Sequence, residues 1–224
     1  MAFDATNFAS VLGAMRANLN DADVQGRACD ALRALAGDYV ADKQRADMPA
    51  CAKNREDIAM AGGVNDIVVA MRAHASNAGI QLKGCWAIWC LYYRSGMADT
   101  PRAKPGEIEC VVAAMGGHPR SADIQAHGCG ALRRIACNAD NKVLVSKAGG
   151  IECIVAAMRA HPGNAAVQEW ACAALINIGW SSTSIRAKIA AAGGPELARI
   201  AMRAFPTLAG VQTEAKDLLE KLAS

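Results

Sequence analysis

The stretch AGGIECIVAAM at residues 148–158, followed by AVQEWACAALINIG at residues 166–179, decides the fold of this chain. In each segment apolar residues recur three, four and seven positions apart, which places them on one side of a helix. Two glycines open the first segment, and a His-Pro-Gly-Asn sequence separates it from the second. This combination predicts a bend, an amphipathic helix, a turn and a second amphipathic helix.

The same pattern occurs five times along the 224 residues. In each copy a methionine is followed nine residues later by Val or Ile and then by Gln. The methionines are Met15, Met71, Met115, Met158 and Met202, and the glutamines are Gln25, Gln81, Gln125, Gln168 and Gln212. Successive methionines lie 56, 44, 43 and 44 residues apart. The chain is therefore an array of repeats with a period of about 43 residues and one insertion between the first two copies.

Three helices are predicted for a complete repeat. Apolar residues at offsets 0, 4, 7, 8 and 11 from the Val or Ile predict the last helix. Three positions before the Val or Ile stands a residue whose side chain can cap the N-terminus of this helix. These residues are Asp21, Asn77, Ser121 and Asn164. A second amphipathic helix precedes each methionine. Upstream of it, NREDIAMAGG, NKVLVSKAGG and IRAKIAAAGG indicate a short helix closed by two glycines, which tolerate the positive φ of a sharp bend.

A three-helix unit of this length with a double-glycine bend resembles the armadillo repeat, and the resemblance covers nearly the whole chain. It implies an all-α, right-handed α-solenoid of about four and a half repeats, forming a single domain over residues 1–224. The repeats are placed at residues 1–37 (partial), 54–94, 98–138, 139–180 and 181–224, with an insertion at 38–53. The two-helix HEAT repeat is the alternative, but it lacks the short first helix.

Four places depart from the regular pattern. The first copy has too few residues ahead of its second helix to form a short first one. The insertion is either a solvated spacer or a functional loop. The third copy reads MADTPRAKPGE, with Pro101 and Pro105 and no glycine pair, so we expect its first helix to be broken or absent. The last copy carries Arg199 and Lys216 where the others are mostly apolar, which predicts an exposed terminal repeat.

Bulk properties exclude several classes of protein. Hydrophobic residues make up 53% of the chain, charged residues 20%, and the net charge is +3, which argues against disorder and against nucleic-acid binding. No apolar run has the length of a membrane span, and MAFDATNFAS does not read as an export signal. Nine cysteines without such a signal favour reduced thiols. We expect a cytoplasmic location, with the nucleus as an alternative.

In armadillo proteins the third helices line a concave groove that holds partners. In the importin-α branch a Trp, followed four residues later by an Asn, grips an extended peptide. Among the matching positions here, only Trp86 keeps the Trp and only Asn177 keeps the Asn, in different repeats. A receptor for basic nuclear signals is therefore not favoured, and Arg134 would repel such a peptide.

The resemblance predicts instead a groove with its own set of contacts. The predicted partner-binding residues are Lys83, Trp86, Cys90, Tyr93, His127, Arg134, Trp170, Asn177 and Trp180. Trp170 and Trp180 could equally fill space between repeats, and Trp89 is either a rim contact or a filler. The predicted function is a non-enzymatic scaffold that binds an extended peptide or a helix of a protein partner, with no membrane partner. The alternatives are a structural role with self-association through exposed repeat ends, or a regulatory subunit.

No catalytic motif, cofactor site or metal site is predicted. The sequence has no Walker loop, nucleophile elbow or HExxH motif. The cysteines that recur at two repeat positions are interpreted as small core residues, and Cys51 in the insertion as the exposed one. Three histidines recur at the end of the second helix, where a helix C-terminus favours them; they are His74, His118 and His161. They lie too far apart to share a metal ion.

Overall fold

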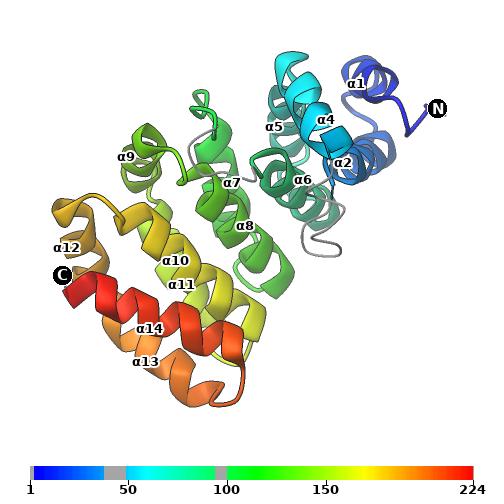
Figure 1. Ribbon diagram of the computed structural model, residues 1–224. Helices are drawn as coiled ribbons and strands as arrows, with labels where there is room; N and C mark the ends of the chain where they lie inside the picture. The colour runs from blue at the N-terminus through cyan, green and yellow to red at the C-terminus, as the bar shows by residue number, and fades with distance from the viewer. Residues whose placement is uncertain (1–2, 38–48, 94–99, 224) are drawn as a thin grey trace.

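A computed structural model describes residues 3–37, 49–93 and 100–223 of the chain. Within these ranges it contains thirteen α-helices and no strand, which confirms the all-α class. Figure 1 shows the helices following one another across the molecule, with the two termini at opposite ends.

The helices fall into five groups that coincide with the five sequence repeats. The first group has α1 (Phe8–Ala17) and α2 (Ala22–Ala36), and the second has α4 (Pro49–Met60), α5 (Gly63–Ala73) and α6 (Ala78–Leu91). The third has α7 (Glu107–Gly117) and α8 (Ala122–Ile135). The fourth has α9 (Ala139–Lys147), α10 (Gly150–Ala160) and α11 (Ala165–Gly179), and the fifth has α12 (Thr183–Ala191), α13 (Gly194–Ala204) and α14 (Ala209–Ala223).

Equivalent helices of successive repeats pack against one another. The second helices contact in the order α1, α5, α7, α10 and α13, and the third helices in the order α2, α6, α8, α11 and α14. Each third helix also contacts the second helix of its own repeat. The buried apolar residues form one core cluster that runs through all five repeats.

The recurring Met and Gln have a common structural cause. In every repeat the Gln side-chain amide donates two hydrogen bonds of 2.8–3.0 Å, to the carbonyl oxygens of the residues ten and seven positions before it. The residue ten positions before is the Met. These carbonyls lie at the C-terminal end of the second helix, where carbonyl groups have no partner within the helix. The Gln therefore ties the end of each second helix to the third helix that follows.

The paired glycines serve two different purposes. Gly62, Gly149 and Gly193 have φ between 81° and 94°, a conformation that residues with a Cβ rarely adopt. The second glycine of each pair allows close approach: a Cβ on Gly150 would lie 2.5 Å from a Val145 methyl carbon. In the third repeat Gly106 keeps the positive φ of 90°, while Glu107 takes the second position.

The helix ends agree with the sequence analysis. Asp21, Asn77, Ser121 and Asn164 are the N-cap residues of α2, α6, α8 and α11, and each side chain accepts a backbone hydrogen bond. The three recurring histidines are C-cap residues of α5, α7 and α10. Each ring Nε2 also donates to a carbonyl of the preceding repeat, at 2.8–2.9 Å. These histidines therefore link neighbouring repeats.

Two expectations about irregular regions can be compared with the structure. Residues 100–106 are not helical, so the described part of the third repeat lacks the short first helix, as predicted. The prediction that Cys51 is exposed was wrong, because its exposed fraction is 7%. Helix α4 begins at Pro49, a residue suited to the first helical position, and so carries residues 49–53 of the predicted insertion onto the packed helix. Residues 38–48 of the insertion lie outside the described residues.

The terminal repeat matches its prediction. The side chains of Arg199 and Lys216 are exposed by 54% and 68%, and each forms an ion pair with a carboxylate of its own helix. The positions that are apolar in interior repeats are therefore solvated here.

Candidate protein-binding face

The predicted partner-binding residues come from α6, α8 and α11 or from the residues that follow α6 and α11 directly. We call the exposed side of α2, α6, α8, α11 and α14 the third-helix face. These five helices contact one another in sequence, so residues at equivalent repeat positions lie in rows across this face. All four tryptophans of the chain belong to α6 or α11, including Trp180, the C-cap of α11.

A row of stacked side chains begins on α2 and crosses to α8. The Lys83 ammonium lies 2.8 Å from the carboxylate of Asp30. The Arg33 guanidinium lies 4.2 Å from the centre of the Trp86 ring, within the range of a cation–π contact. Trp86 also packs against His127, with ring centres 4.4 Å apart.

Further contacts extend this row to α14, through Trp89 of α6, Trp170 of α11 and Arg133 of α8. Trp89 packs edge-on against His127 at 5.7 Å and against Trp170 at 4.7 Å. The Arg133 guanidinium lies 5.3 Å from the Trp170 ring and 3.8 Å from the carboxylate of Glu214. Interactions between side chains thus connect all five third helices.

Trp89, whose role the sequence left open, is a filler. Its exposed fraction is 1%, and its ring occupies the space beside Gly130, where a Cβ would lie 2.5 Å from a ring carbon. Gly130 is therefore needed for close packing of α6 against α8.

The nine predicted residues differ in their access to solvent. Cys90 and Tyr93 are buried, with 1% and 4% exposed, and Tyr93 packs between the guanidinium groups of Arg55 and Arg134 at 5.1 and 4.5 Å. The other predicted residues reach the surface in part; they are Lys83, Trp86, His127, Arg134, Trp170 and Asn177. Trp180 is the most exposed tryptophan, at 52%, and the Lys221 ammonium lies 3.9 Å from its ring centre.

Asn177, the one residue that matches the peptide-gripping asparagine, uses its amide nitrogen inside the protein. Its Nδ2 donates to the Arg133 carbonyl at 3.0 Å and contacts the Cys137 sulfur at 3.5 Å. This contact joins α11 to α8. A backbone-gripping role would require the amide group to leave α8 first.

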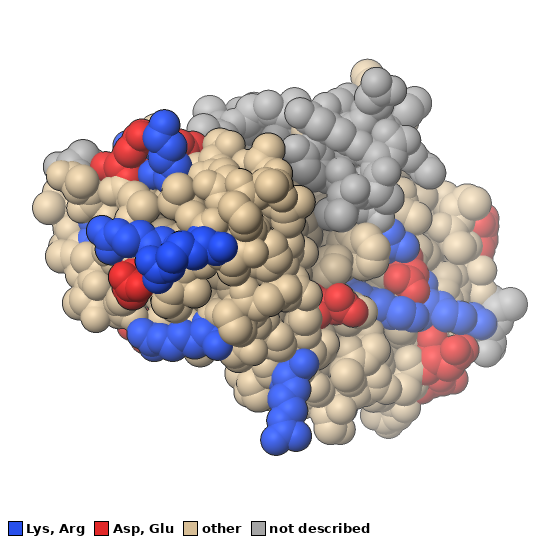
Figure 2. Space-filling model, turned by 90° about the horizontal axis from the view of Figure 1, so that it is seen from below, with Lys and Arg blue, Asp and Glu red and all other residues tan. Residues whose placement is uncertain are grey.

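The cations on this face lie beside carboxylates. Asp30 of α2 is 3.7 Å from the Arg33 guanidinium and 2.8 Å from the Lys83 ammonium, and Glu214 of α14 is 3.8 Å from Arg133. Burial raises the pKa of the Glu214 carboxyl above its usual value, and the Arg133 charge opposes this shift. Figure 2 shows the molecule from below, where Lys and Arg side chains lie among those of Asp and Glu on the part of the surface that is not grey.

The sequence analysis missed two arginines of this face. Arg33 lies nine residues after Val24, and Arg133 lies nine residues after Ile124, so both occupy one position of the repeat. Each stacks on a tryptophan of the next repeat. The repeat alignment contained this signal, since both cations occupy one position of the pattern.

The half-buried thiol of Cys137 shows no sign of activation. Burial raises its pKa above the ordinary value, although the nearby cations Arg134, Arg133 and Lys142 favour the thiolate. Across residues 3–37, 49–93 and 100–223 no group of three or more His, Cys, Asp or Glu side chains is placed to hold a metal ion. In the same ranges no helix is long and apolar enough to span a membrane.

No family model matches the chain, and no curated protein is significantly similar to it. The class of protein must therefore be inferred from its repeats and from the third-helix face.

Proposed function

We propose that this protein is a non-enzymatic binding scaffold made of armadillo-type repeats in a right-handed solenoid, and that it binds an extended peptide or a helix of a partner protein across the third-helix face. The observation that carries this proposal is a set of three tryptophans that reach solvent on α6 and α11, each beside a cation; they are Trp86, Trp170 and Trp180. Trp and Arg are the residues that most often dominate binding energy at interfaces.

The stacked row supports binding because it orders these side chains in advance. Trp86 contacts both Arg33 and His127, and Trp170 contacts both Trp89 and Arg133. Immobilising such side chains costs roughly 0.5–1.5 kcal/mol each when it occurs on binding. A face that is already ordered avoids this cost.

The charges favour a partner segment of mixed charge. Cations and carboxylates occur together on this face, so a partner segment that carries both signs would find complementary groups.

Self-association through the repeat ends is less favoured. Arg199 and Lys216 bring charge to one end of the array, and stacking another repeat there would bury these charges. Light scattering over a range of concentrations tests this, and a mass that rises with concentration would support assembly.

Site-specific photo-crosslinking tests the binding proposal. A photoreactive phenylalanine would replace Lys83 or Trp180 on the third-helix face, and Met60 or Val143 as controls, which are exposed by 80% and 45% on first helices. We expect the same partner to be captured at positions 83 and 180 and not at the controls. Capture at the controls alone would place the binding surface elsewhere, and equal capture at all four positions would indicate non-specific contact.

A further inference from the structure

In the described part of the chain, an arginine links neighbouring repeats at three of the four junctions. This arginine directly follows the recurring methionine of its repeat, and its guanidinium donates to a backbone carbonyl at the bend of the next repeat. The pairs are Arg16 with Ala61 at 2.6 Å, Arg72 with Gly106 at 3.3 Å, and Arg159 with Ala192 at 2.6 Å. Carbonyl groups at such bends have no partner within a helix, so the arginine supplies the donor.

The junction between the third and fourth repeats has no such arginine. Gly116 stands at this position, and a Cβ on it would meet no atom within 4 Å, so the space beside it is open. The carbonyl that corresponds to those of Ala61 and Ala192 is that of Ala148, directly before Gly149. Within residues 3–37, 49–93 and 100–223 no side chain donates to the Ala148 carbonyl.

The bend at Gly149 has a carboxylate where other bends have an arginine. A Cβ on Gly149 would lie 4.0 Å from Glu152 Oε2, whereas at Gly62 and Gly193 the neighbour is an arginine Nη2, at 3.6 and 3.1 Å. Glu152 is exposed, and it forms no ion pair with any described residue, including the exposed Lys147 in the last turn of α9. The bend therefore presents a carbonyl and a carboxylate at the negative end of α9, with no cation paired to either.

The first junction shows how one guanidinium can satisfy both groups. Arg16 Nη2 donates to the Ala61 carbonyl at 2.6 Å, and Arg16 Nε donates to the Asp66 carboxylate at 2.9 Å. Asp66 lies in the first turn of α5, as Glu152 lies in the first turn of α10. A guanidinium has five N–H donors in a planar fork, so it suits this pair of acceptors better than an ammonium does.

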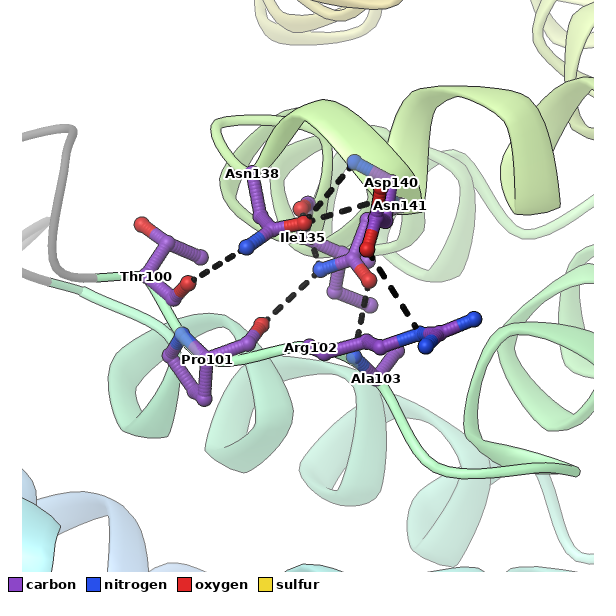
Figure 3. A network of polar contacts seen from close by, with 8 residues as sticks. All are labelled: Thr100, Pro101, Arg102, Ala103, Ile135, Asn138, Asp140 and Asn141. Atoms are coloured by element: carbon purple, nitrogen blue, oxygen red, sulfur yellow. Dashed lines mark hydrogen bonds and ion pairs between the residues drawn. The ribbon is translucent and has the colours of Figure 1, made fainter.

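The opposite end of α9 is held in place by two asparagines (Figure 3). Asn141 is fully buried; its Nδ2 donates to the Pro101 carbonyl at 2.9 Å, and its Oδ1 accepts from the Ala103 backbone N–H at 2.8 Å. Asn138 donates to the Thr100 carbonyl at 3.0 Å. These three hydrogen bonds fix the first turn of α9, so the bend at its last turn is positioned without an arginine.

We infer that the bend between α9 and α10 binds the guanidinium group of an arginine side chain from a partner protein. The guanidinium would donate to the Ala148 carbonyl and pair with the Glu152 carboxylate, in the space that Gly116 leaves open. An exposed ion pair and one hydrogen bond contribute too little to retain a free amino acid, so the arginine belongs to a partner that makes further contacts. The site lies on first and second helices, so it is independent of the proposed function of the third-helix face.

NMR titration of the full chain with N-acetyl-arginine methylamide tests this inference, because the probe carries the side chain and the peptide groups of a partner arginine. We expect saturable shifts of the Gly149 and Glu152 amide signals. Binding should be roughly threefold or more weaker for the uncharged citrulline analogue, and Glu152→Gln should weaken binding of the arginine probe by a similar factor. The Gly62 and Gly193 amides are controls in the same spectrum and should not shift, since the chain's own arginines occupy those bends.

A variant that supplies the arginine separates a specific site from surface adsorption. Gly116→Arg should restore the link between repeats, raise the melting temperature and abolish the shifts. Gly116→Gln is the matched control, because glutamine has a similar helix propensity but no charge; it should raise the melting temperature less and leave binding unchanged.

Four results would overturn the inference: no saturable shift at Gly149, equal binding of the arginine and citrulline probes, unchanged affinity in Glu152→Gln, or binding by a folded Gly116→Arg protein. Equal effects of Gly116→Arg and Gly116→Gln on binding would also overturn it. Free arginine should bind no more tightly than the probe, and tighter binding would identify the amino acid, not a partner protein, as the ligand.

Discussion

Replacing Gln125 by Met tests whether the recurring glutamine holds each repeat together. Methionine has a similar length and volume but no hydrogen-bond donor. Gln125 is 2% exposed, and its Nε2 donates to the carbonyls of Met115 and His118 at 2.8 and 3.0 Å. The substitution leaves two carbonyls at the end of α7 without this partner, at a cost of about 1–3 kcal/mol for each buried group. Allowing for partial relaxation, we expect Gln125→Met to lower the free energy of unfolding by about 2–4 kcal/mol.

Gln212 provides the matched control within the same chain. It makes the equivalent hydrogen bonds to Met202 and Phe205 at 2.8 and 2.9 Å, but it is only partly buried in the terminal repeat. Water can replace the lost donor there, so Gln212→Met should cost about 1 kcal/mol or less.

Urea denaturation followed by far-UV circular dichroism measures both variants. Hydrogen exchange of the α7 and α8 amides shows whether the loss is local, since repeat arrays do not always unfold in one step. A cost below about 1 kcal/mol for Gln125→Met, or equal costs for the two variants, would refute the reasoning.

Two further predictions concern packing and buried thiols. Gly150→Ala places a Cβ 2.5 Å from a Val145 methyl carbon and should cost about 1–3 kcal/mol, whereas Gly13→Ala meets no atom within 4 Å and should stabilise its helix by about 0.5–1 kcal/mol. Calorimetric melting temperatures that move in the same direction for both would contradict this. Burial raises the pKa of the Cys29 thiol from 9.0 to about 12, so the stability it contributes is complete below about pH 9 and is lost as pH rises toward 12. Between pH 9 and 11 this thiol should lower the free energy of unfolding by about 1.4 kcal/mol for each pH unit, and Cys29→Ala should remove that contribution. Urea titrations that give the same slope of unfolding free energy against pH for both proteins would rule this out.

Much of the fold could be predicted because its signals are local. The N-cap of α6 at Asn77 and the positive φ of Gly149 depend on a few neighbouring residues. The absent first helix of the third repeat follows from Pro101 and Pro105 and from the missing glycine pair. Each of these features is decided within one turn or bend of the chain.

The candidate binding face could be predicted only in part. The sequence analysis placed both Trp86 and Tyr93 among the predicted partner-binding residues, yet Trp86 reaches solvent and Tyr93 is buried. Tyr93 lies after α6, where the guanidinium of Arg55 from α4 and that of Arg134 from α8 pack on its ring. Angles on a single helix carry no information about which neighbours cover a side chain.

The sequence by itself determined that the chain is helical, that it repeats about every 43 residues, and where most helices begin and end. Only the tertiary structure decided that Cys51 is buried and that Trp89 fills the space beside Gly130. The physical reason is how far apart along the chain the interacting residues lie. Helix formation, capping and bending depend on residues a few positions apart, whereas burial and cavity volume depend on how side chains from different repeats fit together.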